Sequence, residues 1–352
     1  MGSFVFSHKK YSANLPEANR TKYPSPNVSK ERCYEGMVIN MINVFIDGAE
    51  GTTGLQIRER MESHPHVRLM EIDPGLRKDA AARAEMLNAC DFAILCLPDA
   101  AAIEAVSLVS NPAVRIIDAS TAHRTAEGWI YGIPELGAEQ RQRLAAATRL
   151  TNPGCHATGF VMLARPLVEA GIITSGCPLS ATSVTGYSGG GKKMIAEFES
   201  AGRNPMWTAR PYALGQAHKH LPEMVKHALL TVPPVFMPIL CDYYQGMAVS
   251  IPLAPAMMAQ KLTARELADF YAQKYAGCPC VKAAPYGDGS PEGGYGDPQE
   301  FNGTNLIEIA VYGNDESIVL MARFDNLGKG ASGAAVQNLN IMAGFDETTA
   351  LI

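Results

Sequence analysis

The hydrophobic residues between positions 41 and 120 fall into short apolar runs separated by stretches with helical spacing. Continuous apolar runs predict buried β-strands, and the intervening stretches predict helices. The predicted strands are 42–46, 67–72, 92–97 and 114–117, and the predicted helices begin at Leu55 and span 80–89 and 100–109. Apolar strands that alternate with helices are typical of a parallel sheet covered on both faces. The first region is therefore predicted to be an α/β domain.

The pattern changes after an Asn-Pro-Gly turn at 152–154. Further strands are predicted at 180–185, 247–252, 306–312 and 317–324. Several of them follow one another without a helix between them, which favours a mixed or antiparallel sheet and hence an α+β domain. A last helix, rich in small residues, is predicted at 330–343.

Length and composition agree with two globular domains. The chain has 352 residues, of which 47% are hydrophobic and 18% charged, with a net charge of −5. Without a basic excess, we expect neither nucleic acid nor an anionic membrane as a partner. The longest apolar stretch, 228–240, contains three prolines. It is too short for a bilayer span of about 20 residues.

The first 40 residues differ from the rest of the chain. They hold six basic and three acidic residues and show no periodicity. They lack the apolar run of a secretory signal, although a basic, serine-containing segment is compatible with a transit peptide. We interpret residues 1–40 as a leader or disordered tail, with Met41 opening the folded protein.

The eight cysteines are scattered and form no Cys-x-x-Cys pair. This pattern argues against a structural zinc site and favours a reducing compartment, so we expect a cytoplasmic protein without a bound metal. At most one or two of these thiols are expected to do chemistry.

A glycine-rich loop follows the first predicted strand. Gly48, Gly51 and Gly54 have the spacing of a dinucleotide-binding variant, and the next helix would offer its N-terminus to a pyrophosphate. The strand-then-helix context supports this interpretation over a tight turn without a ligand. After the second strand, Glu71 and Asp73 favour NAD, whereas Arg77 and Lys78 could hold the 2′-phosphate of NADP. The residues alone leave the two cofactors open.

The sharpest chemical signal is Cys155, which follows the Asn-Pro-Gly turn and precedes an apolar helix. A thiol at a helix N-terminus is expected to have a lowered pKa and to act as a nucleophile, because free amides and the helix dipole favour the thiolate. The other seven cysteines are interpreted as inert.

A second reactive segment contains His218, Lys219, His220 and Glu223. A histidine near neutral pKa can move protons, and Glu223 could bend back to orient the His220 ring and raise its basicity. Pro222 predicts an extended backbone here rather than a helix. His-x-His could also bind a metal, but the sequence offers no evident third ligand. We assign proton transfer to His220 and support to His218, with the reverse assignment as the alternative.

The segment 185–193 combines consecutive glycines with Lys192 and Lys193. Backbone amides beside cations suit an anion such as phosphate. By itself this segment is equally compatible with a flexible surface loop.

These motifs, in this order, resemble the N-acetyl-γ-glutamyl-phosphate reductases within the semialdehyde dehydrogenases. The resemblance rests on the segments 48–54, 118–124, 131–135, 152–155, 188–192 and 218–223 and runs from Met41 to the C-terminus. It implies a Rossmann dinucleotide-binding domain at 41–153, completed by 326–352, with an α+β catalytic and dimerisation domain at 154–325. It also implies NADP(H) as cofactor and a homodimer or homotetramer. The continuation 156–159 resembles the shorter of the family's two types.

The resemblance and the motifs together give a set of site residues. The expected catalytic residues are Cys155, His220, His218 and Glu223. The expected cofactor contacts are Gly48, Glu50, Gly51, Thr52, Thr53, Gly54, Arg77, Ser120, Asn326, Gly328 and Gly330. The expected substrate contacts are Arg124, Asn152, Ser188, Gly189, Gly190 and Lys192.

The implied reaction is the NADPH-dependent reduction of N-acetyl-L-glutamyl 5-phosphate, a small-molecule substrate, through a thioester on Cys155. Three alternatives remain at this stage. The same chemistry on aspartyl or N-acyl aminoadipyl phosphate differs too little in chain length to be excluded. A Cys-His hydrolase or transferase would leave the glycine loop unexplained, and a non-catalytic dinucleotide sensor would leave Cys155 and His220 unexplained.

Overall fold

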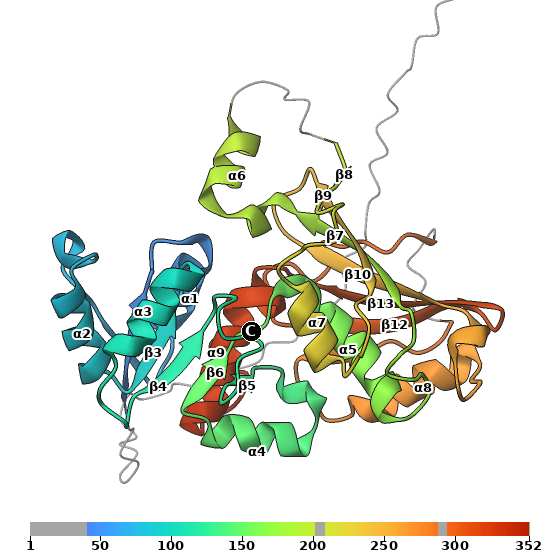
Figure 1. Ribbon diagram of the computed structural model, residues 1–352, viewed down its shortest axis with the longest axis horizontal. Coiled ribbons are helices and arrows are strands. Elements are labelled where there is room, and N and C mark those ends of the chain that lie inside the picture. Colours follow the sequence, from blue (N-terminus) through green and yellow to red (C-terminus); the bar gives the residue numbers. More distant parts are fainter. Residues whose placement is uncertain (1–40, 201–207, 288–293, 352) are drawn as a thin grey trace, which may run out of the picture. The chain divides into compact units, whose positions relative to one another are not determined.

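The computed structural model describes residues 41–200, 208–287 and 294–351 (Figure 1). The expected leader at 1–40 lies outside these residues. The described part contains two sheets, and the predicted combination of an α/β region with an α+β region is confirmed. Within the described ranges, no helix has the length and apolar character that a membrane span requires.

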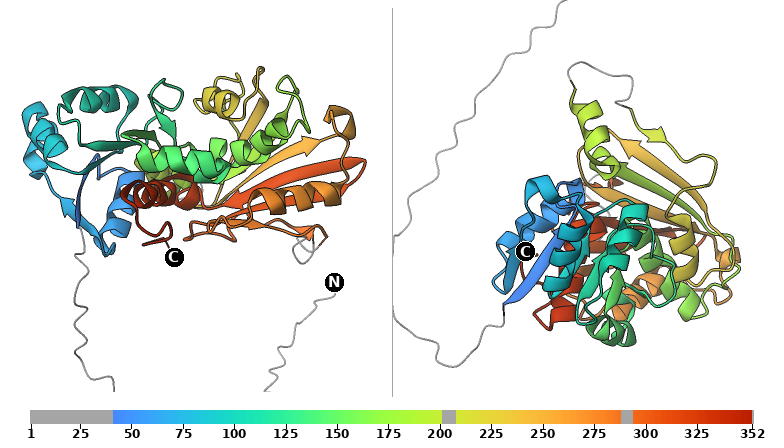
Figure 2. Two further views of the ribbon diagram at one scale, coloured as in Figure 1. Left: turned by 90° about the horizontal axis from the view of Figure 1, so that it is seen from below. Right: turned by 60° about the vertical axis from the view of Figure 1, so that its left-hand side comes forward.

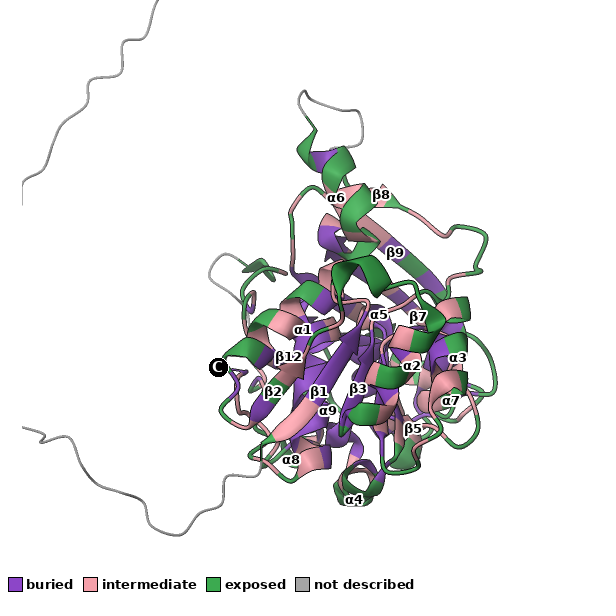
Figure 3. Cartoon of the chain, turned by 90° about the vertical axis from the view of Figure 1, so that its left-hand side faces the viewer, coloured by how far each residue is buried: buried purple, intermediate pink, exposed green. Residues whose placement is uncertain are grey.

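The first sheet is parallel throughout and has the strand order β2-β1-β3-β4-β6-β5 in the described chain. Its strands are β1 (Ile42–Asp47), β2 (Val67–Met70), β3 (Phe92–Leu95), β4 (Arg115–Asp118), β5 (Ile130–Tyr131) and β6 (Arg149–Thr151). Its helices are α1 (Thr52–Glu62), α2 (Ala80–Ala89), α3 (Asp99–Leu108) and α4 (Ala138–Ala146). Figure 3 shows β3 buried along its length, while α2 and α3 each keep an exposed face.

Two boundaries in this region differ from the prediction for local reasons. The strand β2 ends at Met70, before Ile72, because the Asp73 carboxylate accepts a hydrogen bond from the Gly75 amide and starts a short 3₁₀ turn. The helix α1 begins at Thr52, within the glycine loop, and not at Leu55. The loop glycines therefore lie directly at the N-terminus of the helix.

The second sheet is mixed, with the order β11-β12-β13-β10-β7-β9-β8 among the described strands. The strands are β7 (Ser180–Gly186), β8 (Arg210–Pro211), β9 (Val235–Cys241), β10 (Met247–Leu253), β11 (Val281–Ala283), β12 (Ile307–Asn314) and β13 (Ser317–Phe324). The central pairs β12–β13, β13–β10 and β10–β7 are antiparallel, whereas β7–β9 and β11–β12 are parallel. The sheet is thus mixed with an antiparallel centre, as predicted, although only β12 and β13 among these antiparallel pairs follow each other without a helix between them.

Helices cover this sheet and carry the catalytic segments. They are α5 (Cys155–Glu169), α6 (Gly191–Glu199), α7 (Leu221–His227) and α8 (Ala264–Lys274). The helix α5 packs on the sheet (Figure 2) and contacts β10, β13 and α7. Nearly all its side chains up to Leu167 are buried. A helix that is apolar on all sides is stable because it is enclosed. Its burial fixes the position of Cys155 at its first residue.

The chain ends in a π-helical turn (Gly328–Ser332) followed by α9 (Gly333–Ala343). The helix α9 packs against α1 and α4 and shares a hydrophobic core with β1. The π-helical turn itself contacts α1, α5 and β13. Inside it, the buried Lys329 ammonium donates to Glu135 at 2.5 Å and to Gln337 at 2.6 Å. The C-terminal segment therefore joins the glycine-loop helix to the Cys155 helix.

Candidate active site

A cavity of about 600 Å³ gathers the predicted motifs from distant parts of the sequence. The glycine loop contributes residues 51–54, the nucleophile segment contributes 152–156, and the glycine segment contributes 188–191. His218, Lys219 and His220 line the same cavity, as do Asn326 and Gly330. The dinucleotide loop and the thiol thus face one space, which is the arrangement that hydride transfer to a group on Cys155 requires.

The glycine loop fits an anionic ligand. Gly48 has a φ of +88°, and a Cβ on Gly54 would lie 2.5 Å from the Gly48 carbonyl oxygen, so both positions require glycine. A Cβ on Gly51 would meet its nearest atom at 3.5 Å, so the protein itself does not require a glycine there. It forms the N-cap of α1 without a side-chain hydrogen bond, and the buried Thr52 Oγ1 has no partner. These groups fit a pyrophosphate at the helix N-terminus.

A second cavity, of about 490 Å³, adjoins the loop and is lined by Glu50, Glu71, Arg77 and Lys78, among others. The expected cofactor residues Glu50 and Arg77 form an ion pair 2.8 Å apart, and Glu71 pairs with Arg58. Carboxylates and cations thus occur here in matched pairs. Arg77 lines this cavity beside the glycine loop, where a cofactor contact was expected, but the arrangement favours neither NAD nor NADP.

Cys155 is the first residue of α5, as predicted, but its predicted acidity is wrong. Burial raises the pKa of the Cys155 thiol above 9.0. The backbone N–H of His156 and the cations Arg124 and Lys219 lower this pKa, but the cost of placing a thiolate in a buried site is larger. The resting thiol is therefore protonated at neutral pH and needs a base.

We expect alkylation of Cys155 by iodoacetamide to be slow at pH 7 and to accelerate as the pH rises through 9 and above. The raised pKa keeps the reactive thiolate scarce below that range. Timed labelling between pH 6.5 and 10, followed by mass spectrometry of the Cys155 peptide, measures the rate, with glutathione as the reference thiol. A rate that levels off below pH 7.5 would contradict the raised pKa.

The predicted extended backbone around His220 is also wrong, because α7 begins at the next residue, Leu221. Pro222 lies in the first turn of this helix, where a proline removes no helical hydrogen bond. His220 is the N-cap residue and is 5% exposed. The helix therefore directs the Glu223 carboxylate to partners other than the His220 ring.

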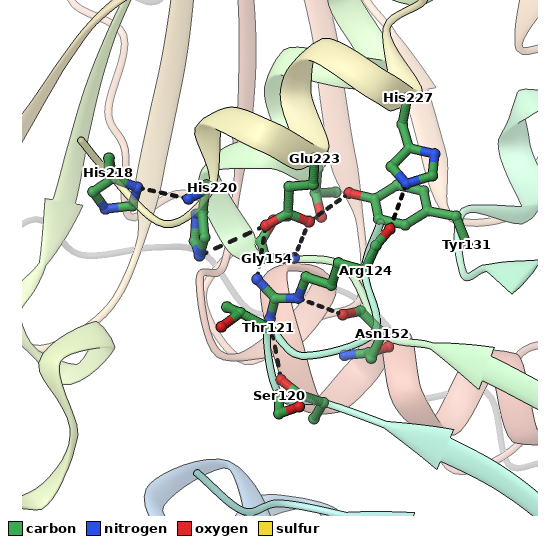
Figure 4. A network of polar contacts seen from close by, with 12 residues as sticks. Ser120, Thr121, Arg124, Tyr131, Asn152, Gly154, His218, His220, Glu223 and His227 are labelled. Atoms are coloured by element: carbon green, nitrogen blue, oxygen red, sulfur yellow. Dashed lines mark hydrogen bonds and ion pairs between the residues drawn. The ribbon is translucent and has the colours of Figure 1, made fainter. Parts of the chain in front are cut away.

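Glu223 lies at the centre of a buried polar network (Figure 4). Its oxygens accept hydrogen bonds from Arg124 at 2.7 Å, from the Tyr131 hydroxyl at 2.8 Å and from the Gly154 amide at 3.1 Å. The His220 Nε2 atom is 3.9 Å from Glu223 Oε1, which is beyond hydrogen-bond distance. Glu223 thus ties the Arg124 side chain to the backbone just before Cys155.

The expectation that Glu223 raises the basicity of His220 is contradicted. Burial, followed by the nearby Arg124 cation, holds the pKa of His220 well below 6.5. The Glu223 charge is balanced by Arg124 and so does not offset these effects. Burial, followed by the Lys219 and Arg124 cations, lowers the pKa of His218 to about 4. Both imidazoles are neutral at physiological pH and can accept a proton.

Gly154 is a site residue that the sequence analysis did not single out. A Cβ on Gly154 would lie 2.4 Å from Arg124 Nη1, 2.5 Å from His220 Nε2 and 2.6 Å from Glu223 Oε1. The network therefore requires glycine at this position. In the sequence, the Asn-Pro-Gly turn was the signal that could have pointed to Gly154, but only the fold shows which side chains lie against this glycine.

Several expected ligand contacts are bound within the protein. The Arg124 guanidinium donates to Glu223 and to the carbonyls of Asn152 and Ala119. The other internal hydrogen bonds are Asn152 Nδ2 to Ala331 O, Ser120 Oγ to Asp118, and Asn326 Nδ2 to Ser188 Oγ. Arg124, Asn152, Ser188 and Asn326 line the cavity, and the contacts of all these side chains with ligands remain predictions.

Three expected contacts, Ser120, Lys192 and Gly328, line neither cavity. Lys192 is exposed on α6 and does not line the cavity, whereas Lys219 does. Gly328 is buried away from it, and a Cβ there would lie 2.2 Å from the Thr304 carbonyl oxygen. The sequence pattern could not separate an anion-binding glycine from one required by packing.

His156 and Tyr212 also belong to the cavity wall and were not predicted. Ligand atoms of Cys155, His156 and His220 lie within 4.8 Å of one another, a cluster that contains His220 but not His218, the other member of the metal pair considered from the sequence. Both ring nitrogens of His156, however, already form hydrogen bonds: Nδ1 with the Ser183 hydroxyl at 2.7 Å and Nε2 with the Tyr212 hydroxyl at 2.9 Å. Cys155 and His220 are the pair left to act together.

Comparison with known proteins agrees with this site. Residues 74–144 match the NAD-binding domain of semialdehyde dehydrogenases, and residues 155–326 match their dimerisation domain. An aspartate semialdehyde dehydrogenase II from Vibrio cholerae, solved in complex with ASA, shares the fold with a TM-score of 0.66 at 16% identity, over 86% of this chain and 98% of that one. The enzyme from Francisella tularensis gives 0.66 at 14% identity, over 86% of this chain and 100% of that one. Fold and site thus define a semialdehyde dehydrogenase, an oxidoreductase with a nicotinamide dinucleotide site.

Curated relatives narrow this class. N-acetyl-gamma-glutamyl-phosphate reductase 2 from Nostoc sp. is 46% identical over 322 residues, which cover 89% of this chain and all of the relative. The reductase of the same name from Pseudomonas putida is 46% identical, over 86% of this chain and 96% of its own. N-acetyl-gamma-glutamyl-phosphate reductase from Burkholderia cenocepacia is 47% identical, over 86% of this chain and 97% of the relative. The chain belongs to the N-acetyl-gamma-glutamyl-phosphate reductase family.

Proposed function

We propose that this chain reduces N-acetyl-L-glutamyl 5-phosphate to N-acetyl-L-glutamate 5-semialdehyde and phosphate with NADPH, as a step of arginine biosynthesis. The observation that carries the proposal is the single cavity lined by the glycine loop, Cys155 and His220. The names of the relatives, which match along nearly their whole length, support the choice of substrate.

In the first step, the Cys155 sulfur attacks the acyl carbon while its proton passes to His220. The carbon–oxygen bond to phosphate breaks, and a thioester with Cys155 remains. A His220 ring nitrogen lies within 4.8 Å of the Cys155 sulfur, so the neutral imidazole can accept the proton as the sulfur attacks. The lowered pKa of His220 and the raised pKa of the thiol leave the proton on sulfur until then. His220 then returns the proton to the departing phosphate.

The second step needs a hydride, which bound NADPH supplies; residues 51–54 would hold its pyrophosphate. The chain's part is to stabilise the oxyanion that develops on the thioester carbonyl. The N-cap residue of α5, Gly154, has no side chain to cap the first-turn amides, and its own amide is bound by Glu223. We therefore assign the oxyanion to a first-turn amide beyond Gly154. Loss of the thiolate then releases the semialdehyde.

We predict that His220→Asn lowers kcat far more than His218→Asn. His220 Nδ1 is buried without a partner, while His218 Nδ1 accepts a hydrogen bond from the His220 amide and so supports the backbone. A loss of about 100-fold or more is expected for a missing general base. The measurement is kcat against pH for both variants. If His218→Asn loses the rate and its pH dependence while His220→Asn keeps both, the assignment is reversed.

We predict a preference for NADP over NAD. Arg77 and Lys78 line the second cavity, and the carboxylates of Glu50 and Glu71 are each already paired with an arginine. This pairing reduces the repulsion that a 2′-phosphate would meet. The ratio of kcat/KM for the two cofactors measures the preference, and a clear advantage for NAD would show that the carboxylates dominate.

The substrate is tested in the reverse direction with N-acetylglutamate semialdehyde, phosphate and NADP, beside aspartate semialdehyde and an N-acyl aminoadipate semialdehyde. The proposal expects the highest kcat/KM for N-acetylglutamate semialdehyde. A higher value for either of the other two would replace the substrate while retaining the mechanism. Dinucleotide binding without phosphate-dependent turnover of any of the three would indicate a sensor.

We further propose a homodimer or homotetramer in the cytoplasm. The matched dimerisation domain supports assembly, and the free state of the seven cysteines in the described residues supports a reducing compartment.

We also propose a division of the chain into two domains, one formed by 41–153 with 326–352 and the other by 154–325. The packing of α9 with β1 and α1 supports this division.

A further inference from the structure

His156, the residue after the nucleophile, bridges two hydroxyl groups. It is 3% exposed, and its Nδ1 lies 2.7 Å from the hydroxyl of Ser183, which β7 buries completely. Its Nε2 lies 2.9 Å from the hydroxyl of Tyr212, which lines the cavity. The imidazole thus connects a buried hydroxyl to one that a ligand can reach.

The bridge has a direction because the imidazole carries one N–H. Burial, followed by the neighbouring His218 ring and the Lys219 cation, lowers the pKa of His156 to about 3, so the ring is neutral at physiological pH. One hydroxyl must then donate to the ring and the other must accept from it. When Ser183 donates to Nδ1, the Nε2–H donates to Tyr212 and the phenolic proton is left for a ligand. An anionic acyl phosphate favours this arrangement, because the opposite one turns only oxygen lone pairs towards it.

The backbone that carries Tyr212 is also held in place. The Tyr212 amide donates to the Pro238 carbonyl at 3.0 Å. Ala213 and Gln216 have φ values of 51° and 53°, a left-handed conformation that is unfavourable without glycine. The Gln216 side chain exchanges two 2.9 Å hydrogen bonds with the backbone of Phe236 on β9. Such strained residues persist where surrounding contacts fix them, and they are common at functional sites.

We propose that the Tyr212 hydroxyl donates a hydrogen bond to an oxygen of the bound acyl substrate, and that His156, supported by Ser183, is the positioning residue that directs it. This inference rests on the proposed function and adds a residue to it. Tyr212 shares the cavity with Cys155, and a His156 ring nitrogen lies within 4.8 Å of the Cys155 sulfur. The hydroxyl is therefore close to the reacting group.

The first test is Tyr212→Phe, which removes one oxygen atom. We expect kcat to fall about ten- to a hundredfold, as for the loss of a hydrogen bond to a charged group, with the Kd for NADP unchanged. The matched control is Tyr286→Phe, whose hydroxyl donates to the Gly313 carbonyl at 3.0 Å away from the cavity lining. An undiminished kcat for Tyr212→Phe would overturn the inference.

The second test is a double-mutant cycle with His156→Leu. If His156 acts through Tyr212, adding Tyr212→Phe to His156→Leu causes little further loss of kcat. His156→Gln, whose amide can still donate towards Tyr212, should recover part of the rate. Additive losses, or no recovery with glutamine, would show that His156 only supports the fold. All variants are assayed on whichever acyl substrate the wild type prefers, so a wrong substrate contradicts the proposed function and leaves this test intact.

Discussion

Cys155→Ser is expected to abolish turnover while dinucleotide binding stays within about twofold of the wild type. A hydroxyl has a far higher pKa than a thiol and is a poor nucleophile without a strong base. The neutral His220 ring, with its pKa held down by burial and Arg124, is too weak a base to activate it. The glycine loop belongs to another segment, and a Cβ on Gly48, Gly51 or Gly54 would have no atom of Cys155 among its nearest neighbours.

The measurement combines kcat with NADP titration by fluorescence or calorimetry. Cys241→Ser is the matched control, because Cys241 is a partly buried thiol outside the cavity lining whose pKa burial also raises. Retention of more than about a tenth of the wild-type rate, equivalent to a barrier change under roughly 1.4 kcal/mol, would remove Cys155 from the covalent role. Loss of both turnover and NADP binding would point to a folding defect.

Gly154→Ala is expected to abolish activity and to destabilise the protein by about 3–5 kcal/mol, the range for breaking a buried ion pair. The added methyl group would lie within 2.6 Å of atoms of Arg124, His220 and Glu223. None of them can retreat freely, because Arg124 is bound to two backbone carbonyls and Glu223 to the Tyr131 hydroxyl. The Arg124–Glu223 pair must therefore separate or the N-terminus of α5 must shift.

Urea unfolding and kcat of the same preparation test this prediction. Gly176→Ala is the control, since a Cβ there would meet its nearest atom, Thr231 Oγ1, at an ordinary 3.7 Å. Equal unfolding midpoints for the two variants would mean that the network is looser than the distances indicate. A stable Gly154→Ala variant with wild-type kcat would show that the network does not position the nucleophile.

Local sequence patterns predicted the architecture and pointed to Cys155 as the expected nucleophile. The apolar runs predicted β1 to β4 of the parallel sheet but not the short strands β5 and β6, and β13 and α2 have their predicted bounds. Strands and helices follow from the spacing of apolar side chains, which the sequence displays directly. The glycine spacing and the turn before Cys155 were equally local, because each lies within a few residues. The family motifs then added the reaction and the cofactor.

Tertiary structure decided the electrostatics of the site. Burial raises the pKa of Cys155, which was expected to be lowered. Arg124, 99 residues before Glu223, binds the carboxylate that the sequence analysis had assigned to His220. The tertiary structure also places Lys192 outside the cavity lining and places His156 and Tyr212 within it. A pKa depends on solvent exclusion and on charges within a few ångströms. Neither the solvent exclusion nor the distances between charges can be read from neighbouring residues, because the groups responsible come together only when β7, α5 and α7 pack.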